Sequence, residues 1–210
     1  MKKSIFFRIA ALAAIVVTMN GCVCKVSLPE VLQQEQSSVV RTRYHIWYKD
    51  PANISMLNYM EGSFIPAGTV IEPIEIERGS YDIWGTVSVT DGMIKFRTPA
   101  DGKEYTMKYD EHLTMMPIEE FLRQLFTTDP AADIYKNVPQ ADLKNVKNGK
   151  LKTGMNRNSI LVLLGPPARS RTTDLNNQSW LYWRNRDVVF RLLFRGDKVR
   201  QIATLDDLAL

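Results

Sequence analysis

The sequence predicts an α+β protein in which a β-rich region precedes a region of helices and strands. Residues 44–112 contain short segments rich in β-branched and aromatic residues, separated by turn signals. Residues 113–148 show helical spacing of apolar residues, and residues 149–205 combine helical patterns with segments of period-two alternation. We therefore expect an N-terminal lipid tether, a small antiparallel β-barrel or sandwich, a helical connector, and a two-layer module of two helices and three strands.

The first 21 residues have the pattern of a secretory signal peptide. A basic start that ends at Arg8 is followed by an apolar stretch over residues 9–17, shorter than the roughly 20 residues of a membrane span. The ending "MNGC" resembles the lipobox at which bacterial signal peptidase cuts before a diacylated cysteine. We therefore expect lipidation of Cys22 and residence on the periplasmic face of the outer membrane. An uncleaved N-terminal anchor helix is the alternative, and it too places the chain outside the cytoplasm.

Cysteine and histidine are too scarce for a metal site or a disulfide framework. The chain has 2 cysteines and 2 histidines, and a lipid thioether on Cys22 leaves Cys24 without a partner. A structural zinc ion needs about four such ligands close together. We expect no metal and no cofactor.

Net charge depends on the leader. The chain has 27 basic and 23 acidic residues, and removal of the three basic residues of the leader leaves 24 against 23. Nucleic acid is therefore not an expected partner, because phosphate binding needs a clustered excess of Lys and Arg. The charge is nevertheless divided, with 13 basic and 18 acidic residues in 22–149 and 11 basic and 5 acidic in 150–210. Either the two parts attract each other, or the C-terminal part meets an acidic partner.

The β-rich region begins after a polar segment. Residues 22–43 are rich in Gln and Ser and lack a sustained apolar period, so we interpret them as a tether between lipid and folded protein. From Tyr44 onward the segments "RYHIWY", "SFIPAGTVIEPIEI", "GTVSV", "GMIKFR" and "KEYTMKY" favour strands, and Asp91-Gly92 and Asp101-Gly102 suit hairpin turns. The stretch "FIPAGTVIEPIEI" resembles the strand and turn sequence of small Src-homology-type barrels in bacterial envelope proteins.

Three helices are expected after the β-rich region. Pro117 suits the first position of a helix that Asp129-Pro130 ends, and a second helix is expected over Gln140–Lys147, before Gly149. The third is "ILVLL", whose apolar run also suits a buried strand. Its borders decide for a helix: Asn156 is a good N-cap, Gly165 can adopt a left-handed conformation, and Pro-Pro follows. The first helix has an apolar face of five residues: Ile118, Phe121, Leu122, Leu125 and Phe126.

The C-terminal strands are predicted by alternation. "SWLYWRN", "DVVFRLLFR" and "KVRQI" are separated by turns, one of them at Gly196-Asp197, and form an antiparallel meander. One face of the second strand, expected to be buried, carries Val188, Phe190, Leu192 and Phe194. The opposite face carries Val189, Arg191, Leu193 and Arg195.

Residues 149–205 contain a Gly-Met pair at 154–155, a short apolar helical run, Leu-Gly followed by Pro167, a Trp-x-Tyr at 180–182 and two final strand-like segments. This pattern resembles the SmpA/OmlA (BamE) family of small envelope lipoproteins. The pattern of that family is Gly-Met, a short helix, Leu-Gly-x-Pro, Trp-x-Tyr and a final β-hairpin. The resemblance implies a two-layer α/β fold, a lipid anchor and a role in envelope assembly or integrity, with the motif residues shaping turns and core. A long β-rich region precedes the motif here, whereas the family members of the assembly machinery are short. The matching positions are Gly154, Met155, Leu164, Gly165, Pro167, Trp180 and Tyr182.

Enzyme chemistry has little support. The sequence has no Gly-x-Ser-x-Gly elbow and no His-Glu-x-x-His, and His45 and His112 are interpreted as structural or solvated. We expect a non-catalytic envelope lipoprotein that acts as an interaction or scaffold module for another envelope protein. A cell-wall-binding module and a protein inhibitor are the alternatives.

The expected working surface is a basic patch edged by tryptophan. Arginines project from the second strand opposite its apolar face, and others lie beside it, so the patch suits an acidic protein surface or an anionic lipid headgroup. The alternative is a solvated face or an internal dock for the acidic β-rich region. The candidate residues are Trp183, Arg184, Arg186, Arg191 and Arg195, with Arg200 adjoining.

Overall fold

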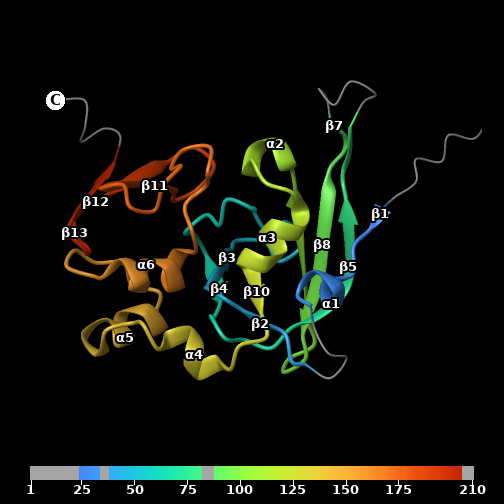
Figure 1. Cartoon of the computed structure of the whole chain (residues 1–210), viewed down its shortest axis with the longest axis horizontal. Helices are drawn as coiled ribbons and strands as arrows, with labels where there is room; N and C mark the ends of the chain where they lie inside the picture. Colours follow the sequence, from blue (N-terminus) through green and yellow to red (C-terminus); the bar gives the residue numbers. More distant parts are fainter. Residues whose placement is uncertain (1–23, 34–37, 82–87, 205–210) are drawn as a thin grey trace, which may run out of the picture.

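The computed structural model describes residues 24–33, 38–81 and 88–204, so the predicted signal peptide and Cys22 lie outside the described residues. The molecule is elongated, with one antiparallel sheet near each end (Figure 1). Each sheet contributes to its own hydrophobic cluster. The structure is thus a mixed α+β protein with several antiparallel sheets.

The larger sheet has the strand order β1-β5-β8-β9. Its strands are β1 (Cys24–Lys25), β5 (Glu72–Arg78), β8 (Gly92–Thr98) and β9 (Lys103–Tyr109). Alternate residues of β8 and β9 are buried, as period-two patterns require. Asp101-Gly102 forms the predicted hairpin turn between them, with Gly102 at φ +69°. Two short strands come between β5 and β8 in the chain and pair with each other: β6 (Ser80–Tyr81) and β7 (Ser88–Thr90).

Asp91-Gly92 differs from the prediction. It joins β7 directly to β8 and makes no hairpin turn, because Gly92 is the first residue of β8 and pairs with Tyr109. A Cβ at Gly92 would lie 2.9 Å from the carbonyl oxygen of Glu77. Close approach of two backbones, not turn geometry, explains the glycine at this position.

The predicted barrel does not form among the described residues, where the larger sheet stays open. Helix α3 (Ile118–Leu125) packs its apolar side into the cluster of this sheet, and Ile118, Leu122 and Leu125 are fully buried. Helix α3, together with buried residues of short strand pairs such as Ile46, Ile65 and Phe126, therefore fills the space that one opposing sheet would occupy in a sandwich. The predicted helix is present, but Pro117 is its N-cap and not its first residue, and it ends at Leu125, before Asp129-Pro130. Phe126 begins β10 (Phe126–Thr127), which pairs with β2 (Arg41–Thr42).

The described part of the expected tether is packed against this cluster. Strand β1 pairs with β5, and helix α1 (Leu28–Val31) contacts α3. Leu28 is 2% exposed and Val31 is also buried. The Gln- and Ser-rich composition concealed these contacts because each involves only one or two apolar residues.

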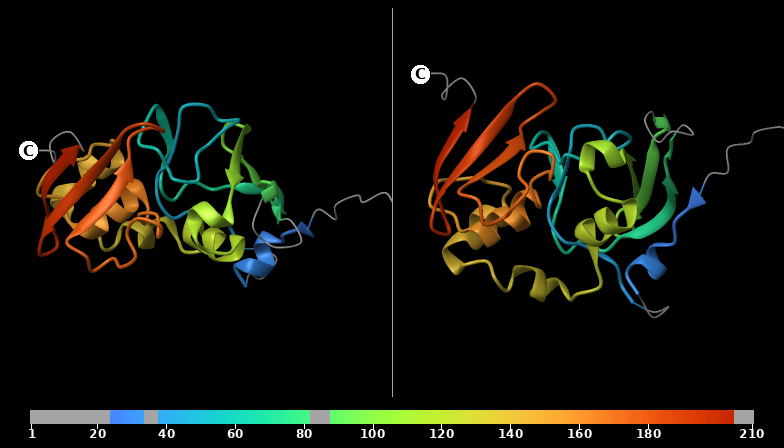
Figure 2. Two further views of the ribbon diagram at one scale, coloured as in Figure 1. Left: turned by 90° about the horizontal axis from the view of Figure 1, so that it is seen from above. Right: turned by 45° about the horizontal axis from the view of Figure 1, so that its top comes forward.

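The C-terminal elements lie where the sequence places them. Helices α5 (Gln140–Lys147) and α6 (Arg157–Leu164) precede β11 (Ser179–Trp183), β12 (Val189–Arg195) and β13 (Lys198–Thr204), which form a sheet in that order. The Asn156 side chain accepts from the N–H of Asn158, which confirms the predicted cap. Views from two further directions show these helices on one face of the sheet (Figure 2). The remaining helices are α2 (Glu111–Thr114) and α4 (Ala131–Tyr135).

Val188 is not buried, contrary to the prediction. It precedes β12 and is 39% exposed, whereas Phe190, Leu192 and Phe194 are buried as predicted. The reason is the hairpin end: the side chain of Asn185 accepts from the N–H of Val188 at 2.8 Å, and the Val188 carbonyl accepts from Arg184 N–H. These bonds hold Val188 in the turn.

The two clusters meet at β3 (Ile46–Tyr48), which pairs with β4 (Ser63–Ile65). The indole N–H of Trp47 donates to the Leu163 carbonyl at 2.9 Å, and the Asn58 amide donates to the carbonyls of His45 and Leu164. These buried bonds join the N-terminal chain to α6. We call this region the junction.

His45 is a structural residue of the junction. It is 0% exposed, its Nδ1 accepts from the Ala67 N–H at 2.7 Å, and its Nε2 lies 2.7 Å from the Val146 carbonyl. Because Nδ1 accepts, Nε2 carries the proton of a neutral ring. Burial lowers the pKa of His45 below its usual value. His112 is exposed in α2.

Candidate functional site

The two faces of the C-terminal sheet differ in what covers them. Trp180, Tyr182, Phe190 and Leu192 are buried in the cluster beneath the helices. On the opposite face, cross-strand pairing sets Leu181 beside Arg191 and Trp183 beside Val189. The alternation predicted from sequence therefore produces an outward face that is both apolar and basic.

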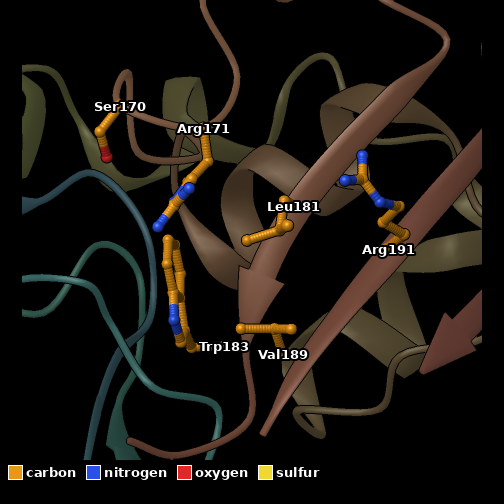
Figure 3. A pocket seen from close by; sticks show the side chains of 6 residues that line it. All are labelled: Ser170, Arg171, Leu181, Trp183, Val189 and Arg191. Carbon is orange, nitrogen blue, oxygen red and sulfur yellow. The ribbon is translucent and has the colours of Figure 1, made fainter. Parts of the chain in front are cut away.

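This outward face contains an open hollow of about 500 Å³, which we call the β11–β12 hollow. Figure 3 shows Arg171 and Trp183 on one side of it and Arg191 on the other, with Leu181 and Val189 between them. Ser170 completes the lining. The hollow thus has an apolar floor between two guanidinium groups.

The walls of the hollow are held by hydrogen bonds. The guanidinium of Arg191 donates to the Ser179 hydroxyl at 3.0 Å. The Thr172 hydroxyl accepts from the N–H of Leu181 at 3.2 Å, which fixes the loop that carries Ser170 and Arg171 against β11. Further along the same loop, Arg157 donates to the carbonyls of Leu175 and Asn177 at 2.8 and 2.9 Å. The site is therefore largely formed before any partner arrives.

The basic side chains around the hollow have no acidic partner in the described part of the chain. The ion pairs found there do not include Arg171 or Arg191. They also leave out the other arginines of the region, Arg184, Arg186, Arg195 and Arg200. The hollow consequently has a positive potential that nearby side chains do not neutralise.

The structure brings together only two of the five predicted patch residues. Trp183 and Arg191 line the hollow. The guanidinium of Arg184 lies 6.0 Å from the ring of Phe190, on the other side of the strand, and Arg195 is exposed at the end of β12. Arg186 lines a different groove. The five residues therefore do not form a continuous patch.

Arg171, Ser170 and Leu181 complete the hollow and were not predicted. Leu181 was visible only as part of an alternating strand. Arg171 comes from a loop without periodicity, and its position depends on the contact between Thr172 and Leu181. The sequence holds no signal for this contact, although Arg169 and Arg171 mark the segment that follows Pro167 as basic.

The residues of the family motif are mostly buried. Met155, Leu164 and Trp180 are each 1% exposed, and Tyr182 donates its hydroxyl to the Gly165 carbonyl at 2.9 Å. Gly165 has φ +74°, and a Cβ there would lie 2.7 Å from the ring of Tyr44. Gly165 therefore serves the junction as well as the helix end. Of the other motif positions, Gly154 has φ +86° and Pro167 is buried.

Comparison of the chain with protein-family models, with curated proteins and with solved structures finds no match. The family resemblance of residues 149–205 therefore rests on the motif positions alone. Within the described ranges, no group of three or more His, Cys, Asp or Glu side chains is placed to hold a metal ion. None of the helices in those ranges has the length and apolar character needed to cross a membrane.

Proposed function

We propose that this protein is a non-catalytic bacterial envelope lipoprotein that binds an acidic surface of another envelope protein. Three observations support the proposal: the leader with its lipobox at Cys22, the BamE-like pattern of residues 149–205, and the β11–β12 hollow. We place the anchored chain at the periplasmic face of the outer membrane, in outer-membrane assembly or envelope integrity.

The single observation that carries the binding role is the pair of guanidinium groups across an apolar floor. Arg171 and Arg191 have no ion-pair partner among the described residues and can each form charge-assisted hydrogen bonds to a carboxylate. Trp183, half-buried at the edge, supplies the large contact area that binding hot spots use. The complementary partner carries carboxylates on both sides of an apolar side chain.

Site-specific photocrosslinking in cells that make the lipidated chain tests this role. A photoreactive residue at Val189, inside the hollow, is compared with one at Ile74, which is exposed on the larger sheet. We expect a discrete protein adduct from position 189 and none from position 74. Arg171→Glu together with Arg191→Glu should reduce the adduct at least about tenfold, because two attractive charge contacts become repulsive.

Two outcomes would contradict the proposal. Equal adducts from both positions would show that the hollow is not the binding surface. An adduct to lipid but not to protein would assign the hollow to an anionic headgroup.

The lipid anchor has its own test. Cys22→Ala should leave an unprocessed precursor that incorporates no labelled palmitate, because the acceptor thiol is absent. Val23, which follows the cysteine, differs from the Asp that resembles an inner-membrane retention signal, so the mature chain is expected in outer-membrane fractions. Normal processing and lipid labelling of the variant would remove the anchor from the proposal.

A further inference from the structure

A second hollow, of about 460 Å³, lies beside the junction. Three separate parts of the chain line it: the loop that follows β3, strand β9 through Lys108, and the hairpin between β11 and β12 through Arg186. We call it the junction groove. Its volume falls within the roughly 300–1,000 Å³ of ligand pockets.

The loop that forms most of the groove is held in place at both ends. The Ile54 N–H donates to the Thr106 carbonyl and the Thr106 N–H to the Pro51 carbonyl, each at 2.8 Å, which joins the loop to β9. At the other end the Met60 N–H donates to the Trp183 carbonyl at 3.1 Å, which joins it to β11. A ligand therefore meets a wall that needs little ordering.

The charged side chains of the groove carry both signs. Lys49, Lys108 and Arg186 are basic, and Asp50 and Glu61 are acidic. The ion pairs in the described ranges involve none of these five side chains. Opposite charges that line one groove without pairing each other can pair instead with a ligand that carries both charges.

Apolar surface lies between these charges. Met56 and Tyr59 are partly exposed in the lining, and the buried Ile54 and Trp47 lie beneath them. Methionine and tyrosine fit irregular apolar ligand surfaces, and the tyrosine hydroxyl adds a polar contact. A compact ligand with an ammonium group, a carboxylate and an apolar portion matches this lining. A free amino acid shares these three features, but a groove of about 460 Å³ lined by three parts of the chain has room for a short peptide with free ends.

We propose that the junction groove binds a short peptide through its free ammonium and carboxylate groups. Lys108 and Arg186 receive the carboxylate, Asp50 and Glu61 receive the ammonium, and the apolar portion lies against Met56 and Tyr59. This site is separate from the β11–β12 hollow and goes beyond the proposed function.

Peptide binding here has a consequence for the whole molecule. Lys108 belongs to the larger sheet, and Arg186 belongs to the C-terminal hairpin. A ligand that contacts both stabilises their arrangement through mass action, because it binds the folded junction and not the unfolded chain.

The test uses the whole mature chain and a pool of random pentapeptides with free ends, followed by NMR of the Met56 methyl group. Matched pools carry an acetylated N-terminus, an amidated C-terminus, or both. We expect the free pool to shift the Met56 signal at millimolar concentration, and each single block to weaken binding about two- to fivefold, as for partly exposed ion pairs.

Variants separate this site from the hollow. Lys108→Glu with Arg186→Glu should abolish the shift, whereas Arg200→Glu, an exposed arginine outside the groove, and Arg191→Glu should leave it unchanged. No shift with any pool, or equal shifts with the free and doubly blocked pools, overturns the proposal. So does loss of the shift in Arg191→Glu, which would move the site to the β11–β12 hollow.

Discussion

The two sheets differ in whether their basic residues form ion pairs. On the larger sheet, Lys25 pairs with Glu75 at 3.1 Å, Lys95 with Glu104 at 2.8 Å and Arg97 with Glu72 at 2.7 Å, and Arg78 pairs with Glu119 of α3. The strands of the C-terminal sheet contain no Asp or Glu at all. Neighbours within this sheet therefore cannot neutralise its arginines, and the charge is available to another molecule.

The division of charge in the sequence does not hold the molecule together. Arg169 and Glu120 form an ion pair between the two parts, but both side chains are exposed, and exposed pairs contribute about 0–1 kcal/mol. The junction relies instead on the buried bonds of His45, Trp47 and Asn58. The excess basic charge of the C-terminal part is therefore not needed for the junction, and our proposal assigns it to an external acidic partner.

The largest expected change in stability comes from a substitution at the junction. Gly165→Val should lower the free energy of unfolding by more than about 3 kcal/mol, because it combines a strained positive φ with a clash against the Tyr44 ring. Gly154→Val shares the positive φ but meets nothing within 4 Å, so it should cost about 1–2 kcal/mol.

The measurement is urea unfolding followed by two probes, one on each sheet. Because Gly165 contacts Tyr44, we expect both probes to shift together in Gly165→Val. If the probe on the larger sheet kept its wild-type midpoint, the two sheets would be independent, as a domain boundary near residue 112 would imply.

The next effect is the pH dependence of the junction. The lowered pKa of His45 means that the folded protein resists protonation. The stability that neutral His45 contributes should therefore be fully present above about pH 6.5, the ordinary histidine pKa. It should fall as the pH decreases below that value, because only the unfolded chain takes up this proton. The loss from this residue is at most about 1.4 kcal/mol per pH unit.

Denaturant titrations between pH 7.5 and 5 check this prediction. His45→Gln cannot titrate, so its stability should depend less steeply on pH than that of the wild type, even though its absolute stability is lower. An identical slope in the two proteins would exclude His45 as the source.

The local elements were predictable and the contacts between them were not. Helix α5 has its predicted bounds, and α6 has its predicted cap at Asn156, because caps and apolar spacing are encoded within a few residues. The open sheet was not predicted, since it depends on how α3 packs against the sheet, and local sequence patterns do not encode that contact. Likewise, the segment "SLPEV" does not predict that Leu28 is buried in the cluster of the larger sheet.

The site follows the same rule. Trp183 and Arg191 share a face because of strand alternation, which the sequence shows. Arg171 joins them only through the path of a loop, and Arg186 turns away at a hairpin whose geometry Asn185 sets. The prediction found the correct strand face and a wrong set of neighbours.

The smallest expected effect compares single arginines on the two sheets. Arg97→Glu breaks an exposed ion pair and places a like charge beside Glu72, so it should lower stability by up to about 1 kcal/mol. Arg191→Glu should change stability by less than about 0.5 kcal/mol, since no ion pair in the described chain depends on it. Unfolding midpoints measured at low salt give both values, and a larger loss for Arg191→Glu would mean that its charge is already satisfied within the molecule.

The central claim is that the C-terminal sheet, and not the larger one, offers its basic charge to a partner. Backbone NMR of the mature chain during titration with the blocked acidic peptide Glu-Leu-Glu-Leu-Glu tests it most directly. We expect shifts at Arg171, Trp183, Val189 and Arg191 that weaken as salt rises, and none at Lys95 or Arg97. Shifts of equal size on the larger sheet, or no shifts around the β11–β12 hollow, would contradict the claim.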